Sequence, residues 1–99
     1  MPTPAVETTP EHDTALAPRW KVLLHDDPVT AFEFVRSMLE RVFDQPASQA
    51  LRITREAHET GVALVEVLPL EQAEFRRDRA HSLARAQGYP LTLTLEPAD

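Results

Sequence analysis

The chain has 99 residues, of which 42% are hydrophobic and 26% charged, so it corresponds to one domain with a modest core. Its net charge of -6 repels phosphate backbones and anionic lipid, which disfavours nucleic-acid-binding and membrane roles. The lack of cysteine excludes disulfides, thiolate catalysis and cysteine-ligated metals, and two glycines cannot build a glycine-rich phosphate loop. No segment approaches the roughly 18 consecutive apolar residues of a membrane span, and no signal-peptide pattern is present, so we expect a cytoplasmic protein.

The first 19 residues contain four of the nine prolines and no hydrophobic period. They are predicted to form a flexible N-terminal extension, and the folded domain is predicted to cover residues 20–99. Residue composition favours an inert leader over an arm that reaches a partner.

The folded part opens with a short apolar run at 20–24, which predicts a strand entering a turn. Thr30 and Glu33 then form a capping-box pattern, followed by apolar residues at helical spacing up to about residue 44. A second helix is predicted from Pro46 to a stop at Gly61.

The remaining elements are a strand, a helix and a strand. Residues 62–68 are almost continuous valine and leucine, which predicts a central strand, and a helix is expected over 70–87 before Gly88. Residues 91–95 alternate leucine with threonine, as in a half-exposed strand. The order β-α-α-β-α-β predicts an α/β (α+β) fold: a small three-stranded antiparallel sheet covered on one face by three helices.

The charged cluster HDDP at residues 25–28 follows the first predicted strand. Adjacent carboxylates repel one another, so Asp26 and Asp27 suit a site where a cation sits between them, although an ordinary acidic turn is an equal alternative. His58 is more often a core or capping residue than a ligand, and the alternative is that it completes a metal site of His/Asp type with these aspartates, for which no further fixed ligand is found. No nucleophile motif is present, and the charged run at 71–79 is typical of a solvated face or a docking surface.

Taken together in this order, four segments resemble the ClpS family of adaptor proteins. They are VLLHDDPVTAFEFV at 22–35, EAHETG at 56–61, EQAE at 71–74 and the strand that follows Pro90 and ends at Glu96. The resemblance is collinear over residues 20–96, and its element order agrees with that predicted from periodicity.

The resemblance implies a non-enzymatic adaptor without a cofactor. Such proteins recognise the N-terminal residue of substrates, usually a bulky hydrophobic one, and deliver them to a Clp AAA+ unfoldase–protease through the N-terminal domain of a ClpA-type or ClpC-type unfoldase. By family position, the α-amine site is Asp26, Asp27 and His58, with Asp27 and His58 as the main acceptors. The side-chain pocket is Thr30, Phe32, Val35, Thr54, Ala57 and Leu91, the unfoldase-docking residues are Glu71 and Arg76, and the extension at 1–19 is the arm that engages the unfoldase.

Several positions depart from the family pattern. Asp26 stands at an asparagine position, and Pro28 replaces a further acid. Phe32 and Thr54 stand where methionine is common. We expect the Thr54 hydroxyl to bond back to a helix carbonyl and leave room for β-branched Ile and Val, while Phe32 fills the pocket floor and disfavours Trp.

Two other functions fit the sequence. One is an α/β protein-interaction module without an amine pocket, similar to a ribosomal stalk C-terminal domain. The other is an enzyme that uses Asp27 and His58 as an acid–base pair.

Overall fold

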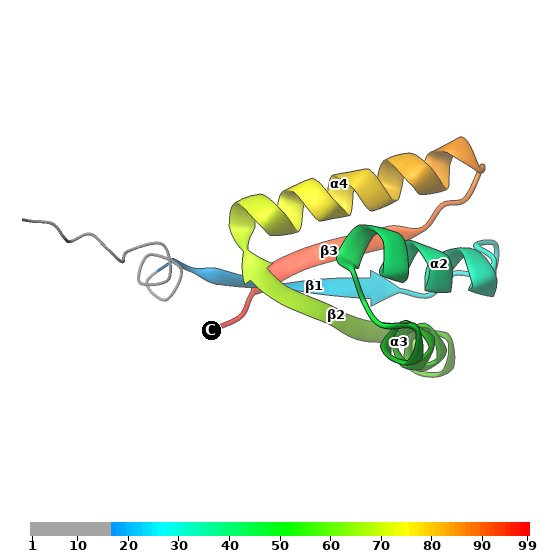
Figure 1. The fold of residues 1–99 in the computed structure, drawn as a ribbon, viewed down its shortest axis with the longest axis horizontal. Coiled ribbons are helices and arrows are strands. Elements are labelled where there is room, and N and C mark those ends of the chain that lie inside the picture. Colours follow the sequence, from blue (N-terminus) through cyan, green and yellow to red (C-terminus); the bar gives the residue numbers. More distant parts are fainter. Residues whose placement is uncertain (1–16) are drawn as a thin grey trace, which may run out of the picture.

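The computed structural model describes residues 17–99 and contains the six predicted elements in the predicted order (Figure 1). They are β1 (Arg19–His25), α2 (Phe32–Phe43), α3 (Ala47–Thr60), β2 (Val62–Pro69), α4 (Leu70–Ala86) and β3 (Thr92–Pro97). β1 begins one residue before the predicted boundary, and residues 1–16 of the proposed extension lie outside the described residues. No helix within residues 17–99 is both long and apolar enough to cross a bilayer.

The three strands form one antiparallel sheet with the order β2-β1-β3, as predicted for the fold class. The prediction that residues 62–68 form the central strand is wrong, because β1 lies between the other two. A bulge shifts the β1–β2 register between Val22 and Leu23. The bulge adds one residue to β2 and shifts the alternation of buried residues, so that Ala63 and Val65 are buried up to the bulge and Leu68 after it.

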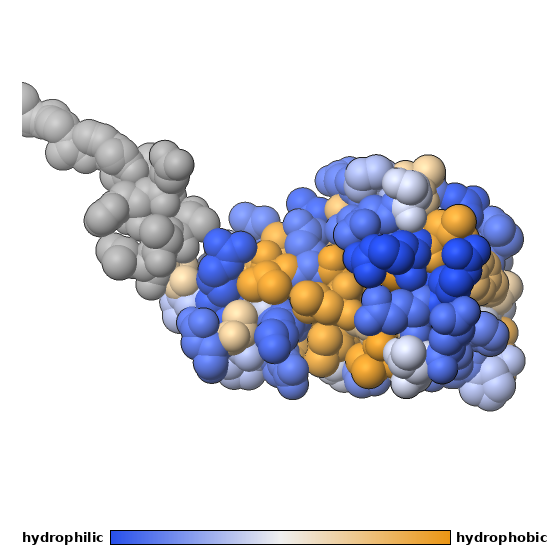
Figure 2. Space-filling view, turned by 90° about the horizontal axis from the view of Figure 1, so that it is seen from below, coloured by the Kyte–Doolittle hydropathy of each residue, from blue (hydrophilic) through white to orange (hydrophobic). Residues whose placement is uncertain are grey.

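The helices pack on one face of the sheet and bury a single core (Figure 1). Val22 and Leu24 of β1 are fully buried on that face, whereas Val62 and Leu64 of β2 remain exposed. Figure 2, which views the molecule from the side of β2 and α3, accordingly shows apolar surface between hydrophilic regions. The largest fully buried side chains are Leu24, Met38, Leu39, Ile53, Leu91, Leu93 and Val22.

The end of α3, which carries Ala57 and His58, is fixed next to the end of β1. Gly61 adopts φ 97°, a left-handed conformation that favours glycine, and its amide donates to the Ala57 carbonyl at 2.8 Å. The Asp26 amide donates to the Gly61 carbonyl at 3.0 Å. The predicted glycine stop is therefore confirmed, and it ties the end of α3 to the end of β1.

Candidate functional site

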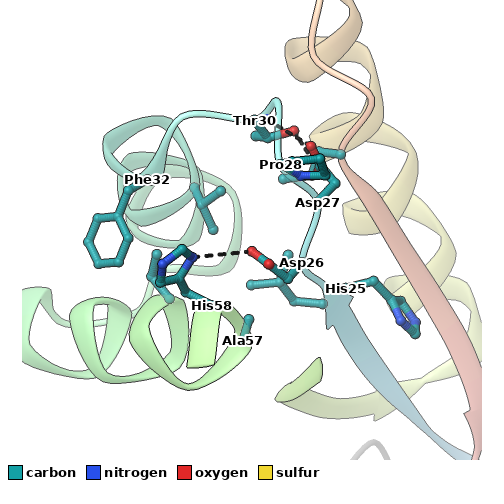
Figure 3. A pocket seen from close by; sticks show the side chains of 12 residues that line it. His25, Asp26, Asp27, Pro28, Thr30, Phe32, Ala57 and His58 are labelled. Atoms are coloured by element: carbon teal, nitrogen blue, oxygen red, sulfur yellow. Dashed lines mark hydrogen bonds and ion pairs between the residues drawn. The ribbon is translucent and has the colours of Figure 1, made fainter. Parts of the chain in front are cut away.

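A cavity of about 370 Å³ opens where β1 ends, between α2 and α3 (Figure 3). All nine residues assigned to the amine site and the side-chain pocket line it: Asp26, Asp27, Thr30, Phe32, Val35, Thr54, Ala57, His58 and Leu91. Leu24, His25 and Pro28 also line it and were not predicted, although they adjoin the predicted residues in sequence. His25 is peripheral, because its ring points away from the cavity and Nε2 lies 2.7 Å from Thr94 Oγ1.

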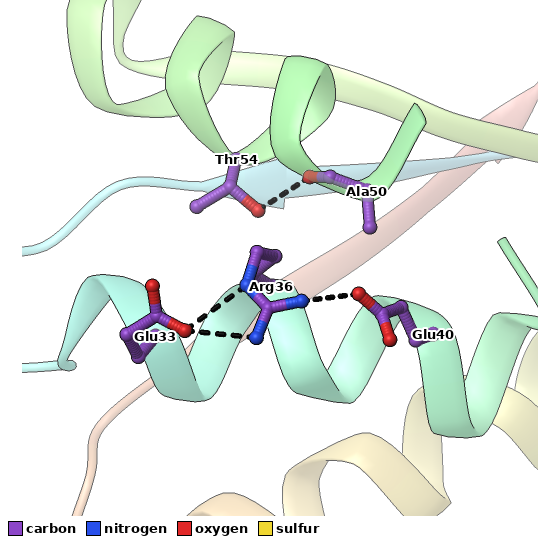
Figure 4. A network of polar contacts seen from close by, with 5 residues as sticks. All are labelled: Glu33, Arg36, Glu40, Ala50 and Thr54. Atoms are coloured by element: carbon purple, nitrogen blue, oxygen red, sulfur yellow. Dashed lines mark hydrogen bonds and ion pairs between the residues drawn. The ribbon is translucent and has the colours of Figure 1, made fainter. Parts of the chain in front are cut away.

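The deep part of the cavity is apolar. Its most buried lining residues are Leu24, Val35, Thr54, Ala57 and Leu91. Thr54 is 2% exposed, and its hydroxyl donates to the Ala50 carbonyl at 2.7 Å (Figure 4), as expected from the sequence. The hydroxyl is thus satisfied within α3, and the cavity can accept an apolar side chain without leaving a buried polar group unpaired.

Phe32 lies at the rim of the cavity. The residue is 37% exposed, and its ring meets the His58 ring edge to face, with centroids 6.3 Å apart and an interplanar angle of 88° (Figure 3). The expectation that Phe32 fills the pocket floor is therefore wrong. Phe32 is the first residue of α2, next to the loop, so its ring reaches across the opening toward α3.

Asp26 and His58 face each other across the mouth (Figure 3). His58 Nδ1 lies 3.6 Å from Asp26 Oδ1, too far for a direct hydrogen bond. The side chains of His58 and Asp26 are 69% and 37% exposed, so both reach solvent at the opening. Because charged N–H···O bonds span about 2.7–2.9 Å, one ammonium nitrogen can approach both acceptors.

Asp27 has a different arrangement. Its Oδ1 accepts from the amides of Val29 and Thr30 at 2.8 and 2.7 Å, and its Oδ2 accepts from the Thr30 hydroxyl at 2.7 Å. Burial raises the pKa of Asp27, but the bonds from Thr30 and Val29 outweigh burial and hold its pKa below the usual value. Asp27 therefore holds the loop in shape, and Figure 3 shows its carboxylate directed at Thr30.

These bonds also explain why the predicted capping box is wrong. The Thr30 hydroxyl donates to Asp27, and α2 begins at Phe32 with Ala31 as its N-cap and no side-chain cap. Asp27 provides an ionised acceptor for the hydroxyl, and hydrogen bonds to charged groups are stronger than neutral ones.

The structure does not gather the metal site considered from the sequence. Within residues 17–99, no group of three or more histidine, aspartate or glutamate side chains is placed to hold a metal ion. Asp27 is turned into the loop, which leaves Asp26 and His58 as a facing pair.

The two predicted docking residues lie on α4, in different environments. Glu71 is exposed in the first turn. The guanidinium of Arg76 is turned toward the end of α2, where Nη1 lies 3.7 Å from Asp44 Oδ2 and donates to the Val42 carbonyl at 3.4 Å. Arg76 is thus partly engaged within the fold.

Comparison with known proteins identifies the family. The sequence model of "ATP-dependent Clp protease adaptor protein ClpS" matches residues 15–94. The ClpS adapter protein of Desulfatibacillum aliphaticivorans is 40% identical over 92 residues, covering 93% of this chain and 88% of the relative. The ClpS adapter protein of Nitratidesulfovibrio vulgaris (strain Miyazaki F) is 44% identical over 85 residues, which cover 85% of each chain.

The fold matches a solved structure of the same family. Agrobacterium tumefaciens ClpS2 bound to L-phenylalaninamide superposes with a TM-score of 0.78 and 35% identity, covering 81% of this chain and 96% of that one. Sequence and fold therefore agree over most of the chain, and the protein belongs to the ClpS family of Clp protease adaptor proteins.

Proposed function

We propose that the chain binds the free N-terminal residue of substrate proteins, with a preference for bulky hydrophobic residues, and delivers those proteins to a Clp AAA+ unfoldase–protease in the cytoplasm. The observation that carries this proposal is the pairing of Asp26 and His58 at the mouth of an apolar cavity. The related ClpS2 structure supports it, because L-phenylalaninamide combines a free α-amine with an aromatic side chain.

The two parts of the cavity match the two parts of such a residue. An α-amine has a pKa of about 7.7–8.0 and is mostly protonated near neutrality, so it offers a positive charge and three donors. Asp26 supplies a carboxylate, and the His58 ring supplies a nitrogen acceptor. The apolar side chain enters the buried part beside Thr54 and Leu91 and gains stabilisation by leaving water.

Asp27 contributes by fixing the loop. Its three hydrogen bonds hold Val29 and Thr30 in place, and they set the position of the adjacent Asp26. The proposal thus assigns direct amine binding to Asp26 and His58, whereas the family resemblance alone emphasised Asp27 and His58.

Delivery requires a second surface. We assign docking of the N-terminal domain of a ClpA-type or ClpC-type unfoldase to Glu71 and Arg76, on a helix that contributes nothing to the cavity lining. In the free protein Arg76 lies beside Asp44, so docking through Arg76 competes with this internal ion pair.

A degradation assay tests the whole proposal. A reporter protein that begins with Leu is incubated with each type of unfoldase and its protease, with and without this chain. We expect the chain to accelerate degradation of the Leu reporter and not of a reporter that begins with Ser. Reversing both docking charges, with Glu71→Lys and Arg76→Glu, should abolish delivery and leave peptide affinity unchanged. An interaction module without an amine pocket would accelerate neither reporter, and an enzyme would alter the peptide itself.

A further inference from the structure

The rim of the cavity carries an aromatic pair, Phe32 and His58, of which only His58 is assigned to the α-amine in the proposed function. The rings of Phe32 from α2 and His58 from α3 meet at nearly a right angle, and Phe32 is 37% exposed. A large apolar side chain held at the opening of a pocket is available for contact with a ligand that extends out of it. Figure 3 shows the ring beyond His58, on the side of His58 away from Asp27 and Thr30.

The path of a bound chain leads past this ring. With its amine between Asp26 and His58 and its side chain in the cavity, the first residue must direct its carbonyl group outward across the rim. The next Cα lies about 3.8 Å further on. The Phe32 centroid is 6.3 Å from that of His58, so a chain whose amine is held by His58 and which runs toward α2 would bring its second side chain near this ring.

We propose that Phe32 is a specificity-determining residue for the second position of the substrate, and that it favours a large aromatic side chain there. This inference rests on the proposed function, since it uses the orientation of the first residue. Aromatic rings gain from edge-to-face or offset contact beyond the area that they bury.

The charged residues near Phe32 do not offer a free partner for an acidic second residue. Arg36, one helical turn after Phe32, is held by Glu33 at 2.9 Å and by Glu40 (Figure 4). An acidic second residue would therefore have to compete with these carboxylates for Arg36, and it would meet the negative charge of Glu33 and Glu40. Asp or Glu at this position should be disfavoured.

Matched peptides test this inference. Three peptides that begin Leu-Phe, Leu-Ser and Leu-Asp and are otherwise identical are titrated into the full chain. We expect Leu-Phe to bind about 2- to 10-fold more tightly than Leu-Ser, and Leu-Asp to bind most weakly. Because the comparison is a ratio between peptides with the same first residue, effects of a variant on the first-residue pocket cancel.

Variants test whether the Phe32 ring causes the difference in affinity between the Leu-Phe and Leu-Ser peptides. Phe32→Ala should reduce the Leu-Phe to Leu-Ser ratio to about 1, whereas Phe32→Tyr should preserve it. Phe75→Ala is the matched control, because Phe75 is 64% exposed on α4 and does not line the cavity, and it should leave the ratio unchanged.

Two results would overturn the inference: equal affinities of Leu-Phe and Leu-Ser for the parent protein, or an unchanged ratio in Phe32→Ala. Failure of all three Leu peptides to bind would instead contradict the proposed function, so the two failures are distinguishable.

Discussion

Two regions of this protein hold partly buried carboxyl groups, and their pKa values are shifted in opposite directions. At the cavity mouth, Asp27 accepts three hydrogen bonds from its own loop, and its pKa is lowered although burial acts to raise it. At the junction of β2 and α4, burial raises the pKa of Glu66, only partly offset by Arg76, and nearby Asp44 raises it further. Glu66 Oε1 is buried and has no hydrogen-bond partner.

The comparison shows that loop hydrogen bonds stabilise Asp27 as an anion against the effect of burial, whereas Glu66 is buried without such bonds and is destabilised as an anion. It also separates the adjacent residues Asp26 and Asp27. Asp27 is committed to the loop, while Asp26 makes none of those bonds and faces His58 at the opening. A carboxylate that the fold does not use is the one available to a ligand.

The largest expected effect is therefore on affinity, at Asp26 and His58. Asp26→Ala or His58→Ala removes a charged hydrogen bond to the ammonium group, which costs about 1.5–3 kcal/mol, or roughly 10- to 100-fold in Kd. Titration with a Leu peptide measures this loss, and thermal unfolding should show little change. Glu59→Ala, at an exposed α3 residue next to His58, is the control. Wild-type affinity in Asp26→Ala would show that the assignment is wrong.

The next effect is on stability, at Asp27. Asp27→Ala removes three loop hydrogen bonds and should lower the free energy of unfolding by about 1–3 kcal/mol. Asp27→Asn keeps an oxygen acceptor for the two amides and should retain most of this stability. Because the pKa of Asp27 is lowered on folding, its contribution as an anion is present above its ordinary pKa of 3.8 and is lost as the pH falls through the folded-state value. Denaturant unfolding checks these variants, and equal stability of the Ala and Asn variants would contradict the role of the loop bonds.

A smaller effect concerns which first residues fit. The Thr54 hydroxyl is bonded to Ala50, and its short side chain leaves room in the cavity for a branched β-carbon. We therefore expect the parent to bind Leu and Phe best and to tolerate Ile and Val. Thr54→Met should widen the difference between Leu and Ile peptides by about 1 kcal/mol. Competition between peptides that begin with Leu, Ile and Val measures the difference, and Thr60→Met, at an exposed position of α3, is the control. Strict rejection of Ile and Val by the parent would refute this expectation.

The smallest effect is at the second region. The raised pKa of Glu66 means that the folded state holds the proton more tightly than the unfolded chain, so stability is lost as the pH rises from below 4.5 through the folded-state pKa. Glu66→Gln should therefore be more stable than the parent at neutral pH, by less than about 1 kcal/mol, and the advantage should shrink as the pH falls toward 4.5. Unfolding curves at several pH values test this, with the exposed Glu74→Gln as the control. A less stable Gln variant at neutral pH would show that the attraction of the nearby Arg76 charge outweighs burial.

Most of the fold could be predicted from the sequence, because local signals mark its elements. Helical spacing located α2 and α3, and Gly61 marked the end of α3 because its left-handed φ favours glycine. The position of β2 at the sheet edge could not be predicted, because the bulge that rearranges its buried face arises from pairing with a distant strand.

The residues of the site were predicted through family resemblance, since periodicity alone gives no reason for segments 26–32, 54–58 and Leu91 to converge. Their roles were harder to predict. The sequence does not show whether Asp26 or Asp27 points into the cavity. The only hint is that an Asp in a turn commonly accepts hydrogen bonds from the backbone amides that follow it. The rim position of Phe32 depends on where α2 begins, and the capping-box pattern misplaced that start.

The most direct test of the central claim is a titration with two peptides that start with Leu and differ only at the α-amine, one free and one acetylated. We predict that the free peptide binds and that acetylation reduces its affinity at least about 100-fold, because the acetylated nitrogen has no charge to place between Asp26 and His58. Equal affinity for the two peptides would contradict the claim that this cavity recognises a free N-terminus.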